Sequence, residues 1–219
     1  MSLWRPPIEF DIVQSIPETE HLYRMKQKDI EKFAECANRA YAGYPLFEEL
    51  SADIDENVIR DLMRTKFGNI PDGAVALSTG DDVPAVSLFL PPGTKECGIR
   101  KYIGSGGSGL LRKIGRKNAK FLLDSEEYDN SQRKRLTGGR GWYLEELHVD
   151  PRYRGRGLSS KLLYPMLEYL GRIGETCYLE THKKVNVEIY NHFGFGLMDS
   201  GIIPGTSVRQ YAMIWRPHD

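Results

Sequence analysis

The segment that decides the fold reads WYLEELHV (142–149), DPRYRGRG (150–157) and LSSKLLYPMLEYLGRI (158–173). The first part is rich in apolar and aromatic residues and predicts a strand. The last part repeats leucine and methionine at helical spacing and predicts an amphipathic helix. A strand, a glycine-containing loop and a helix therefore follow one another directly along the chain.

The loop at 150–157 carries the clearest chemical signal in the sequence. Gly155 and Gly157 lack a Cβ atom, so the backbone can approach a ligand closely there. The loop opens a helix, whose first N–H groups have no partner within the helix and attract anions. Arg152, Arg154 and Arg156 add positive charge. The loop thus predicts a phosphate or pyrophosphate site; the alternative is a tight strand-to-helix turn with solvated arginines.

The chain beyond this helix continues to alternate between strand and helix. We expect a strand at 177–180, a short helix at 186–192 and a turn at 194–196. Two last strands, at 197–202 and 209–215, form a closing hairpin. The strand–helix–strand order that starts at Trp142 is one βαβ unit, which places two strands of one sheet in parallel.

In the part of the chain before Trp142, the sequence predicts two helices followed by two strands. Apolar residues at helical spacing indicate helices over 27–42 and 56–66. The β-rich runs 74–77 and 84–90 form a hairpin. Residues 94–140 are the least regular part, and we expect an insertion that carries one or two helices. This order of elements indicates an α/β or α+β layered fold with a mixed sheet.

Length and charge restrict the class of protein. We expect a single domain over 1–219, because a chain of 219 residues suits one domain of generous size. The 30 basic and 30 acidic residues balance, which argues against a field that collects nucleic acid or anionic membrane. No run of about 18 apolar residues occurs, and the first residues form no secretory signal. We therefore expect a cytoplasmic protein with no nucleic-acid or membrane partner.

Cysteine usage points the same way. Cys36, Cys97 and Cys177 are few and widely spaced. An odd, sparse set argues against a disulfide framework or a zinc site, so we expect a reducing compartment and no metal. Cys36 and Cys177 fall in apolar segments, where a buried structural thiol is expected more often than a catalytic one.

A second motif follows the strand at 177–180. Asn186, Tyr190 and Gly194-Phe195 form an N-x-x-x-Y-x-x-x-G-F pattern. Together with Arg152-x-x-Gly155-x-Gly157, this pattern resembles the GNAT superfamily of acetyl-CoA-dependent N-acetyltransferases. The resemblance implies a mixed, mostly antiparallel central sheet with helices on both faces. It also implies a single acetyltransferase domain in which 94–140 is a helical insertion.

Within this superfamily the sequence looks most like the puromycin N-acetyltransferase group. Trp142-Tyr143-Leu144 opens the strand as it does there, Pro165 interrupts the long helix, and Pro91-Pro92-Gly93 follows the hairpin. The likeness is strong over 142–196 and loose elsewhere. Ser159 departs from the small residue usual at its position. The 94–140 insertion and the 204–209 segment match no pattern, so the identity of the acceptor does not carry over.

The resemblance implies that acetyl-CoA binds along the strand end, the loop and the next helix. Backbone groups of the strand would pair with the pantetheine arm and the acetyl oxygen, and the loop would hold the phosphates. Asn186 would fix the loop or a pantetheine amide. The implied cofactor residues are Leu147, His148, Val149, Arg152, Arg154, Gly155, Arg156, Gly157, Leu158, Ser159 and Asn186.

The resemblance also implies direct transfer, in which an amine attacks the thioester. Such a site needs a neutral amine, a donor to the carbonyl oxygen and a proton for sulfur. Tyr190 matches the family's tyrosine that protonates the leaving thiolate, and its ordinary pKa of about 10 suits that task. The alternative is a core tyrosine.

Two adjacent carboxylates are candidates for the base. Strand alternation puts Glu145 and Glu146 on opposite faces, so one of them points into the cleft. We favour Glu145 because it aligns with a glutamate expected in the close relatives. His148 is a weaker candidate, and two ordinary polar positions are the alternative.

The acceptor is the least determined part of the prediction. We expect the primary amine of a small molecule, such as an aminonucleoside, a polyamine or an antibiotic-like compound, and a monomeric or homodimeric enzyme. A protein or peptide N-terminus is one alternative acceptor. A non-catalytic acyl-CoA-binding or sensor module on the same fold is the other alternative. A dinucleotide-binding enzyme is disfavoured because Ser160 replaces the third glycine of its motif.

Two basic segments have a plainer interpretation. The stretch 112–120 has the spacing of a helix face in solvent, and it lacks the interleaved aromatic residues of a nucleic-acid platform. His182, Lys183 and Lys184 follow a strand, where a solvated basic loop is expected rather than a phosphate contact.

Overall fold

The structure is a computed structural model that describes residue 16 and residues 22–50, 57–94 and 108–217 of the chain. Its helices are η1 (Gln27–Asp29), α2 (Ile30–Ala40), α3 (Pro45–Glu48), α4 (Asn57–Gly68), α6 (Ser108–Ile114), α7 (Arg116–Thr137), η2 (Pro151–Tyr153), α8 (Leu158–Ile173) and α9 (Lys184–His192). Its strands are β1 (Tyr23–Arg24), β2 (Val75–Ser78), β3 (Ala85–Leu90), β4 (Trp142–Val149), β5 (Cys177–Thr181), β6 (Phe195–Ile202) and β7 (Arg209–Trp215).

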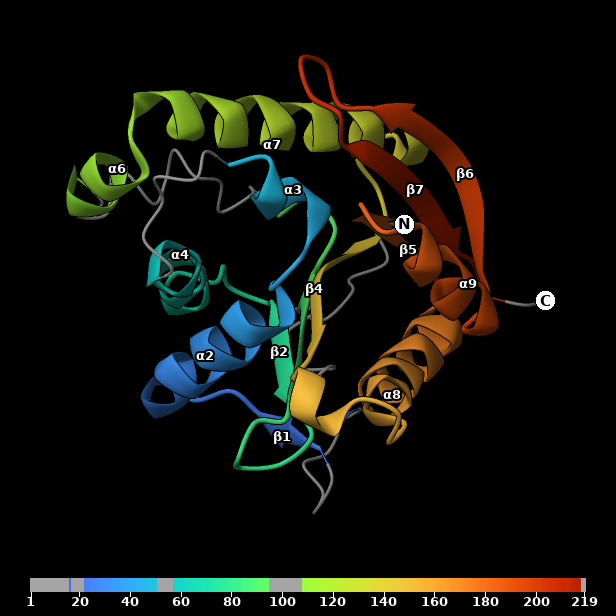
Figure 1. Cartoon of the computed structure of the whole chain (residues 1–219). Coiled ribbons are helices and arrows are strands. Elements are labelled where there is room, and N and C mark those ends of the chain that lie inside the picture. The colour runs from blue at the N-terminus through green and yellow to red at the C-terminus, as the bar shows by residue number, and fades with distance from the viewer. Residues whose placement is uncertain (1–15, 17–21, 51–56, 95–107, 218–219) are drawn as a thin grey trace.

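The strands form one seven-stranded sheet in the order β1-β2-β3-β4-β5-β7-β6. Neighbouring strands are antiparallel except β4 and β5, which are parallel. Helices α2, α4, α6 and α7 gather on one side of the sheet, and α8 and α9 lie on the other (Figure 1). The predicted mixed, mostly antiparallel sheet with helices on both faces is therefore confirmed.

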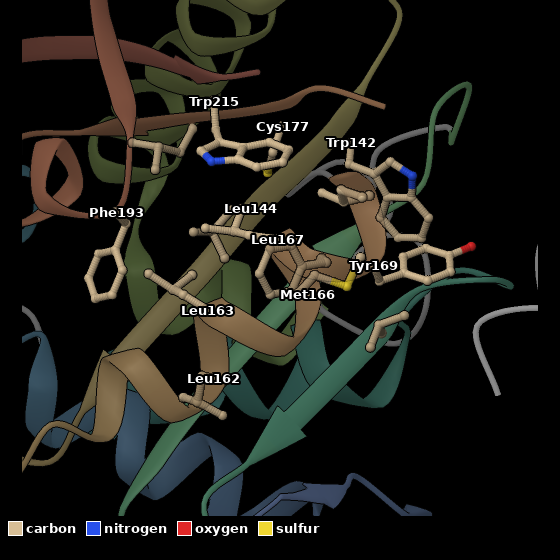
Figure 2. Packing of buried hydrophobic residues seen from close by; sticks show 14 of the residues in the cluster. Trp142, Leu144, Leu162, Leu163, Met166, Leu167, Tyr169, Cys177, Phe193 and Trp215 are labelled. Atoms are coloured by element: carbon tan, nitrogen blue, oxygen red, sulfur yellow. The ribbon is translucent and has the colours of Figure 1, made fainter. Parts of the chain in front are cut away.

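Helix α8 fills the first core because its apolar residues share one face. Leu163, Met166 and Leu167 pack against Trp142 and Leu144 of β4 (Figure 2). Each of these side chains is buried, and burying one large apolar side chain stabilises a fold by about 1.5–3 kcal/mol. This packing fixes where α8 begins relative to the end of β4, and so it positions the glycine loop between them.

The opposite face of the sheet forms a second core with α2 and α4. Phe33 of α2 and Phe67 of α4 meet edge-to-face with ring centroids 5.4 Å apart, and both are buried. Leu62 of α4 and Leu122 of α7 join the same cluster. The four helices on this side are thereby held against β3 and β4, next to the site described below.

Most predicted elements are confirmed, with shifts at their ends. The segments 142–149 and 158–173 match β4 and α8 residue for residue, and α8 continues through Pro165. The described part of 94–140, which leaves out 95–107, carries the helices α6 and α7, and Gly138 with a left-handed φ of 63° ends the 22-residue α7. The last helix begins at Lys184, two residues earlier than predicted, and β6 begins at Phe195.

Two short elements were missed. Strand β1 has only two residues, and its pairing with β2 is a long-range contact that no local pattern announces. Helix α3 is a single turn that Pro45 starts, at a place where the sequence predicted only the end of a helix.

The structure also describes two of the three cysteines. Cys36 and Cys177 are buried thiols, as expected, whereas Cys97 lies outside the described residues. Within the described ranges, no helix combines the length and apolar character needed to cross a membrane.

Candidate active site

The parallel strands β4 and β5 separate soon after they meet. They pair only at Trp142 with Cys177 and at Tyr143 with Tyr178, although β4 continues to Val149. Beyond Tyr143, the β5-facing edge of β4 has no partner among the described strands. Its backbone N–H and C=O groups are therefore available to a ligand.

A cavity of about 430 Å³ occupies this place, and we call it the loop cleft. It is lined chiefly by residues 144–149 of β4, by residues 153–155 and 157–159 of the loop and α8, and by Asn186, Ile189 and Tyr190 of α9. The cleft thus joins the open edge of a strand to the first turn of a helix. Crevices at the carboxyl ends of parallel strands are the usual ligand sites of α/β sheets.

Backbone geometry makes the loop suitable for an anion. Gly155 and Gly157 have φ values of 76° and 69°, in the left-handed region that favours glycine. Gly157 is the N-cap of α8, and no described side chain caps that end. The N–H groups of the first turn, which contains Leu158 and Ser159, are therefore open to a ligand, and the helix dipole adds positive potential there.

The three loop arginines take different positions. Arg154 lines the loop cleft. Arg152 instead binds Asp150, with its Nε atom 3.0 Å from Oδ1 and its Nη2 atom 2.6 Å from Oδ2. Arg156 lies over the ring of Tyr153 at 5.2 Å. Of the three, only Arg154 faces the cleft, and Arg152 contributes by fixing the loop.

Asp150 anchors the base of the loop. It is fully buried, accepts the backbone N–H of Arg152 at 3.0 Å, and also accepts Arg39 Nε of α2 at 2.6 Å. Its hydrogen bonds from Arg152, followed by those from Arg39, hold the pKa of this carboxyl well below its usual range. Asp150 therefore stays ionised and ties the loop to α2.

Two residues of α9 were predicted from the second motif, and both line the loop cleft. Asn186 donates from Nδ2 to Thr181 Oγ1 at 2.9 Å and so ties α9 to the end of β5. Tyr190 is 8% exposed, and its ring meets Phe195 edge-to-face at 5.7 Å. Burial raises the pKa of Tyr190 well above its usual value, so its phenol keeps its proton and can act as a donor.

A β-bulge changes the expected arrangement of the two glutamates. Leu88 pairs with Glu146 while Phe89 pairs with Leu144, so Glu145 is an extra residue on β4. The prediction that alternation places Glu145 and Glu146 on opposite faces is therefore wrong. A regular alternation pattern cannot reveal the extra residue, because the bulge is defined by the pairing with β3.

Both carboxylates reach the same cation. Lys66 Nζ of α4 lies 3.2 Å from Glu145 Oε1, and it also binds Glu146 Oε1 closely. After the bulge the alternation is reversed: Leu147 packs toward the core that contains α8, and His148 turns toward Tyr41 at the end of α2. The bulge thus gathers two acids on the α4 side of the sheet.

Glu146 is the more firmly bound of the two acids. Besides Lys66, its carboxylate accepts the Tyr41 hydroxyl at 2.7 Å and lies 2.5 Å from His148 Nε2. Burial alone would raise the pKa of Glu146, but Lys66 and His148 outweigh it and hold the pKa well below the usual range. Such a carboxylate is a poor proton acceptor and a strong structural anchor.

Glu145 is in a different state. Burial raises the pKa of Glu145, and the negative charge of the neighbouring Glu146 raises it further. Lys66 lowers this pKa, but the net shift is upward. Its Oε2 atom is buried and has no hydrogen-bond partner among the described residues. A carboxylate with a raised pKa and a free lone pair is suited to accept a proton near neutral pH.

A second cavity, of about 160 Å³, adjoins the first, and we call it the acidic cavity. Its walls come from residues 41–47, from α4, from one face of α7, and from the ends of β4 and β5. Glu145, Glu146 and Glu180 line both cavities, so the two meet there. Among the described residues, no group of three or more His, Cys, Asp or Glu side chains is arranged to hold a metal ion.

Several of these residues were missed by sequence reasoning. Lys66, Ser125 and Asp129 were not singled out, and His182, expected in a solvated loop, is only 8% exposed and lines the acidic cavity. Ser125 and Asp129 are four residues apart on α7, so the period of that helix could have paired them. No local signal could have shown that their helix face meets β5.

Two sequence comparisons show what this chain is similar to. Residues 121–195 match the Acetyltransferase (GNAT) family. A Schizosaccharomyces pombe protein named as an uncharacterized N-acetyltransferase is 28% identical over 181 residues, which span 78% of this chain and 72% of that protein.

Solved structures share the fold. A Corynebacterium glutamicum structure, described as histone acetyltransferase HPA2 and related acetyltransferase, has a TM-score of 0.59 at 20% identity and covers 92% of this chain and 98% of its own. The Drosophila melanogaster polyamine N-acetyltransferase, which forms N-acetylagmatine, has a TM-score of 0.57 at 13% identity and covers 89% and 98%. At these identities the likeness concerns the fold.

Proposed function

We propose that this chain, an acetyltransferase of the GNAT superfamily, moves an acetyl group from acetyl-CoA to the primary amine of a small molecule by direct attack. The observation that carries the proposal is the meeting of two cavities at Glu145. One has an anion-binding backbone and the other is lined by carboxylates. A site for a phosphate-bearing donor thus adjoins a site for a basic acceptor.

The loop cleft fits the donor in the chemistry of its lining. The first turn of α8, with Gly155, Gly157 and Arg154, would hold the pyrophosphate. Backbone groups on the open edge of β4, from Leu147 to Val149, would bind the pantetheine arm. Acetyl-CoA would supply the thioester carbonyl carbon to which the acceptor nitrogen binds.

Two side chains would move the protons. Glu145 would take a proton from the acceptor's ammonium group, directly or through water, so that a neutral nitrogen forms the new C–N bond. Tyr190 would give its proton to the sulfur as the C–S bond breaks. The nitrogen would lose a second proton as the amide forms, and that proton would restore Tyr190 through solvent, while Glu145 would release the first proton to solvent. The amide and the free thiol are then the two products.

One comparison supports an amine acceptor, and a second supports an acceptor of small size. The relative from Schizosaccharomyces pombe is named an N-acetyltransferase, and the Drosophila enzyme of the same fold acts on a polyamine. The narrower likeness to the puromycin N-acetyltransferase group also stays a proposal, since it depends on the motifs at 89–93 and 142–165 alone.

Calorimetric titration with acetyl-CoA tests the donor site. We expect micromolar binding by the intact chain and a loss of at least about 100-fold in Gly157→Glu, since that change puts a negative side chain and a strained backbone at the anion site. Gly139→Glu is the matched control, because Gly139 also has a positive φ of 76° but does not line the loop cleft.

Release of free thiol with a panel of amines then tests the transfer. Absence of acetyl-CoA binding by the intact chain would contradict the donor site. Tight binding without thiol release from any amine would favour a non-catalytic sensor. Acetylation of peptide N-termini in preference to small amines would favour a protein acceptor.

A further inference from the structure

The acidic cavity is lined by more acidic than basic side chains. Five carboxylate residues line it, against one lysine and one histidine. The carboxylates are Glu126, Asp129, Glu145, Glu146 and Glu180. Lys66 is already bound to Glu145 and Glu146, so it balances only that end of the cavity. The remaining acids favour a cationic ligand.

Four buried polar atoms in this cavity have no hydrogen-bond partner among the described residues. They are Ser125 Oγ, Glu145 Oε2, Glu180 Oε2 and His182 Nε2. Leaving a buried polar atom without a hydrogen bond destabilises a fold, and native proteins leave few such atoms. Their gathering around one cavity indicates a ligand that donates several hydrogen bonds, as an ammonium group does.

The acids are distributed between two ends of the cavity. Glu145 also lines the loop cleft, so it marks the end where the acetyl group arrives. Asp129 and Glu126 of α7 line the acidic cavity and do not line the loop cleft. Glu180 at the end of β5 lines both. A ligand with one nitrogen at Glu145 can therefore place a second nitrogen toward α7.

The α7 end is held in place by its neighbours. Gln210 of β7 donates from Nε2 to Asp129 Oδ1 at 2.5 Å, and His182 Nε2 lies 3.9 Å from the same oxygen. Tyr143 donates its hydroxyl to Glu180 Oε1. The Tyr178 hydroxyl lies close enough to Glu180 for the pKa of the phenol to be raised by it, after burial, although neither Tyr178 Oη nor Glu180 Oε2 has a close hydrogen-bond partner among the described residues. Each acid keeps acceptor capacity for a further donor.

Part of the remaining wall is apolar. Leu46, Phe47, Leu62, Met63 and Leu122 line the cavity beside the polar side chains of Tyr41, Tyr44, Asn130 and Tyr143. The apolar side chains suit the methylene groups of a ligand. The lining therefore combines several acids with an apolar patch.

We propose that the acceptor is a short aliphatic diamine, whose reacting nitrogen lies at Glu145 and whose second ammonium group binds Asp129 and Glu180. This inference rests on the proposed acetyltransferase function and specifies its substrate class. The distal ammonium stays protonated throughout, while the reacting nitrogen loses its proton before it attacks.

Because Glu180 changes its charge with pH, the affinity for the diamine should depend on pH. The groups that interact with Glu180 come from several elements. They are Asp129 and Arg133 of α7, Tyr143 and Glu145 of β4, Tyr178 of β5, Tyr190 of α9, and Tyr44. Burial, followed by the charge of Asp129, raises the pKa of Glu180 to about 8. Below that pH the protonated acid attracts a cation weakly. Diamine affinity should therefore rise as the pH is raised toward 9.

Two paired measurements test the proposal, with 1,4-diaminobutane and butylamine as probes. One is kcat/KM from thiol release with acetyl-CoA, and the other is calorimetric binding in the presence of CoA. We expect the diamine to exceed the monoamine by at least about tenfold in both, as one added charge contact would give. Asp129→Asn should bring the ratio close to one, while Glu127→Gln, an equal charge change on the exposed face of α7, should preserve it.

Ser125→Ala serves as a second variant that changes no charge. We expect it to weaken diamine binding by about threefold and to leave the thermal transition in place. Equal kcat/KM and equal binding for diamine and monoamine would overturn the inference and leave the acetyltransferase function standing. Loss of acetyl-CoA binding would instead contradict the proposed function, and the diamine titration without CoA would still decide whether the cavity prefers a dication.

Discussion

The loop cleft and the acidic cavity meet at Glu145, but they are made of different groups. The loop cleft is lined mainly by one stretch of the chain, 144–159, which includes the open edge of β4 and the first turn of α8, and α9 closes one side. The acidic cavity is formed by side chains from α4, α7, β4 and β5, which are far apart in the chain. Backbone donors suit a ligand shared by many enzymes, and side chains suit a ligand that differs from one enzyme to the next.

The same contrast separates the two neighbouring acids on β4. Glu146 is held by Tyr41, Lys66 and His148, so it stays ionised and orders the site. Glu145 contacts Lys66 through one carboxylate oxygen, and its other oxygen has no hydrogen-bond partner among the described residues. One glutamate thus supports the structure, and its neighbour is left to exchange a proton.

The largest expected effect comes from removing the base. Glu145→Gln should lower kcat by about 100-fold or more, because general-base catalysis contributes roughly 10²–10⁴-fold. Acetyl-CoA affinity should change by less than about threefold, since the phosphate contacts remain. Stopped-time thiol release and calorimetry measure the two quantities. A kcat within about twofold of the wild type would remove Glu145 from the proton path.

A smaller kinetic effect is expected from removing the hydroxyl of Tyr190, the proposed general acid. Tyr190→Phe keeps the ring contact with Phe195 and removes the hydroxyl. We expect kcat to fall by about tenfold to 100-fold, because a thiolate is a tolerable leaving group without a donor. The thermal transition should be unchanged, and Tyr164→Phe, at an exposed ring of α8, is the control. An unchanged kcat would make Tyr190 a core residue only.

The smallest expected effect concerns stability and distinguishes Glu180 from Glu146. The folded-state pKa of Glu180 is raised to about 8, above the usual value near 4.3 for an unfolded chain. The folded state therefore binds more protons between these values, and Glu180 makes the protein less stable as the pH rises through that window. Glu180→Gln should be relatively more stable at pH 9 than at pH 6.

Thermal unfolding at both pH values measures this difference. Glu146 changes the stability with pH in the opposite direction, because its pKa is lowered in the folded state. The stability that its carboxylate contributes is present above the unfolded-state pKa and is lost as the pH falls into the acid range. Glu146→Gln should therefore lose most stability at neutral pH and converge on the wild type at low pH. The same pH dependence in both variants would contradict the distinction between the two carboxylates.

The sequence by itself determined the part of the molecule in which neighbours in the chain are neighbours in space. The strand at 142–149, the helix at 158–173 and the two left-handed glycines between them follow from side-chain periodicity and backbone freedom. Asn186 and Tyr190 were singled out because their motif resembles that of a known family, and both line the loop cleft.

Only the tertiary structure decided the acidic cavity and the roles of the two glutamates. Lys66 and Tyr41 reach Glu146 from 80 and 105 residues away, and Asp129 meets β5 through a helix whose place in space no local pattern fixes. The bulge at Glu145 exists only in the pairing of β4 with β3. Such contacts depend on the packing of the whole chain, because a side chain's partner, burial and pKa are set by what surrounds it in space.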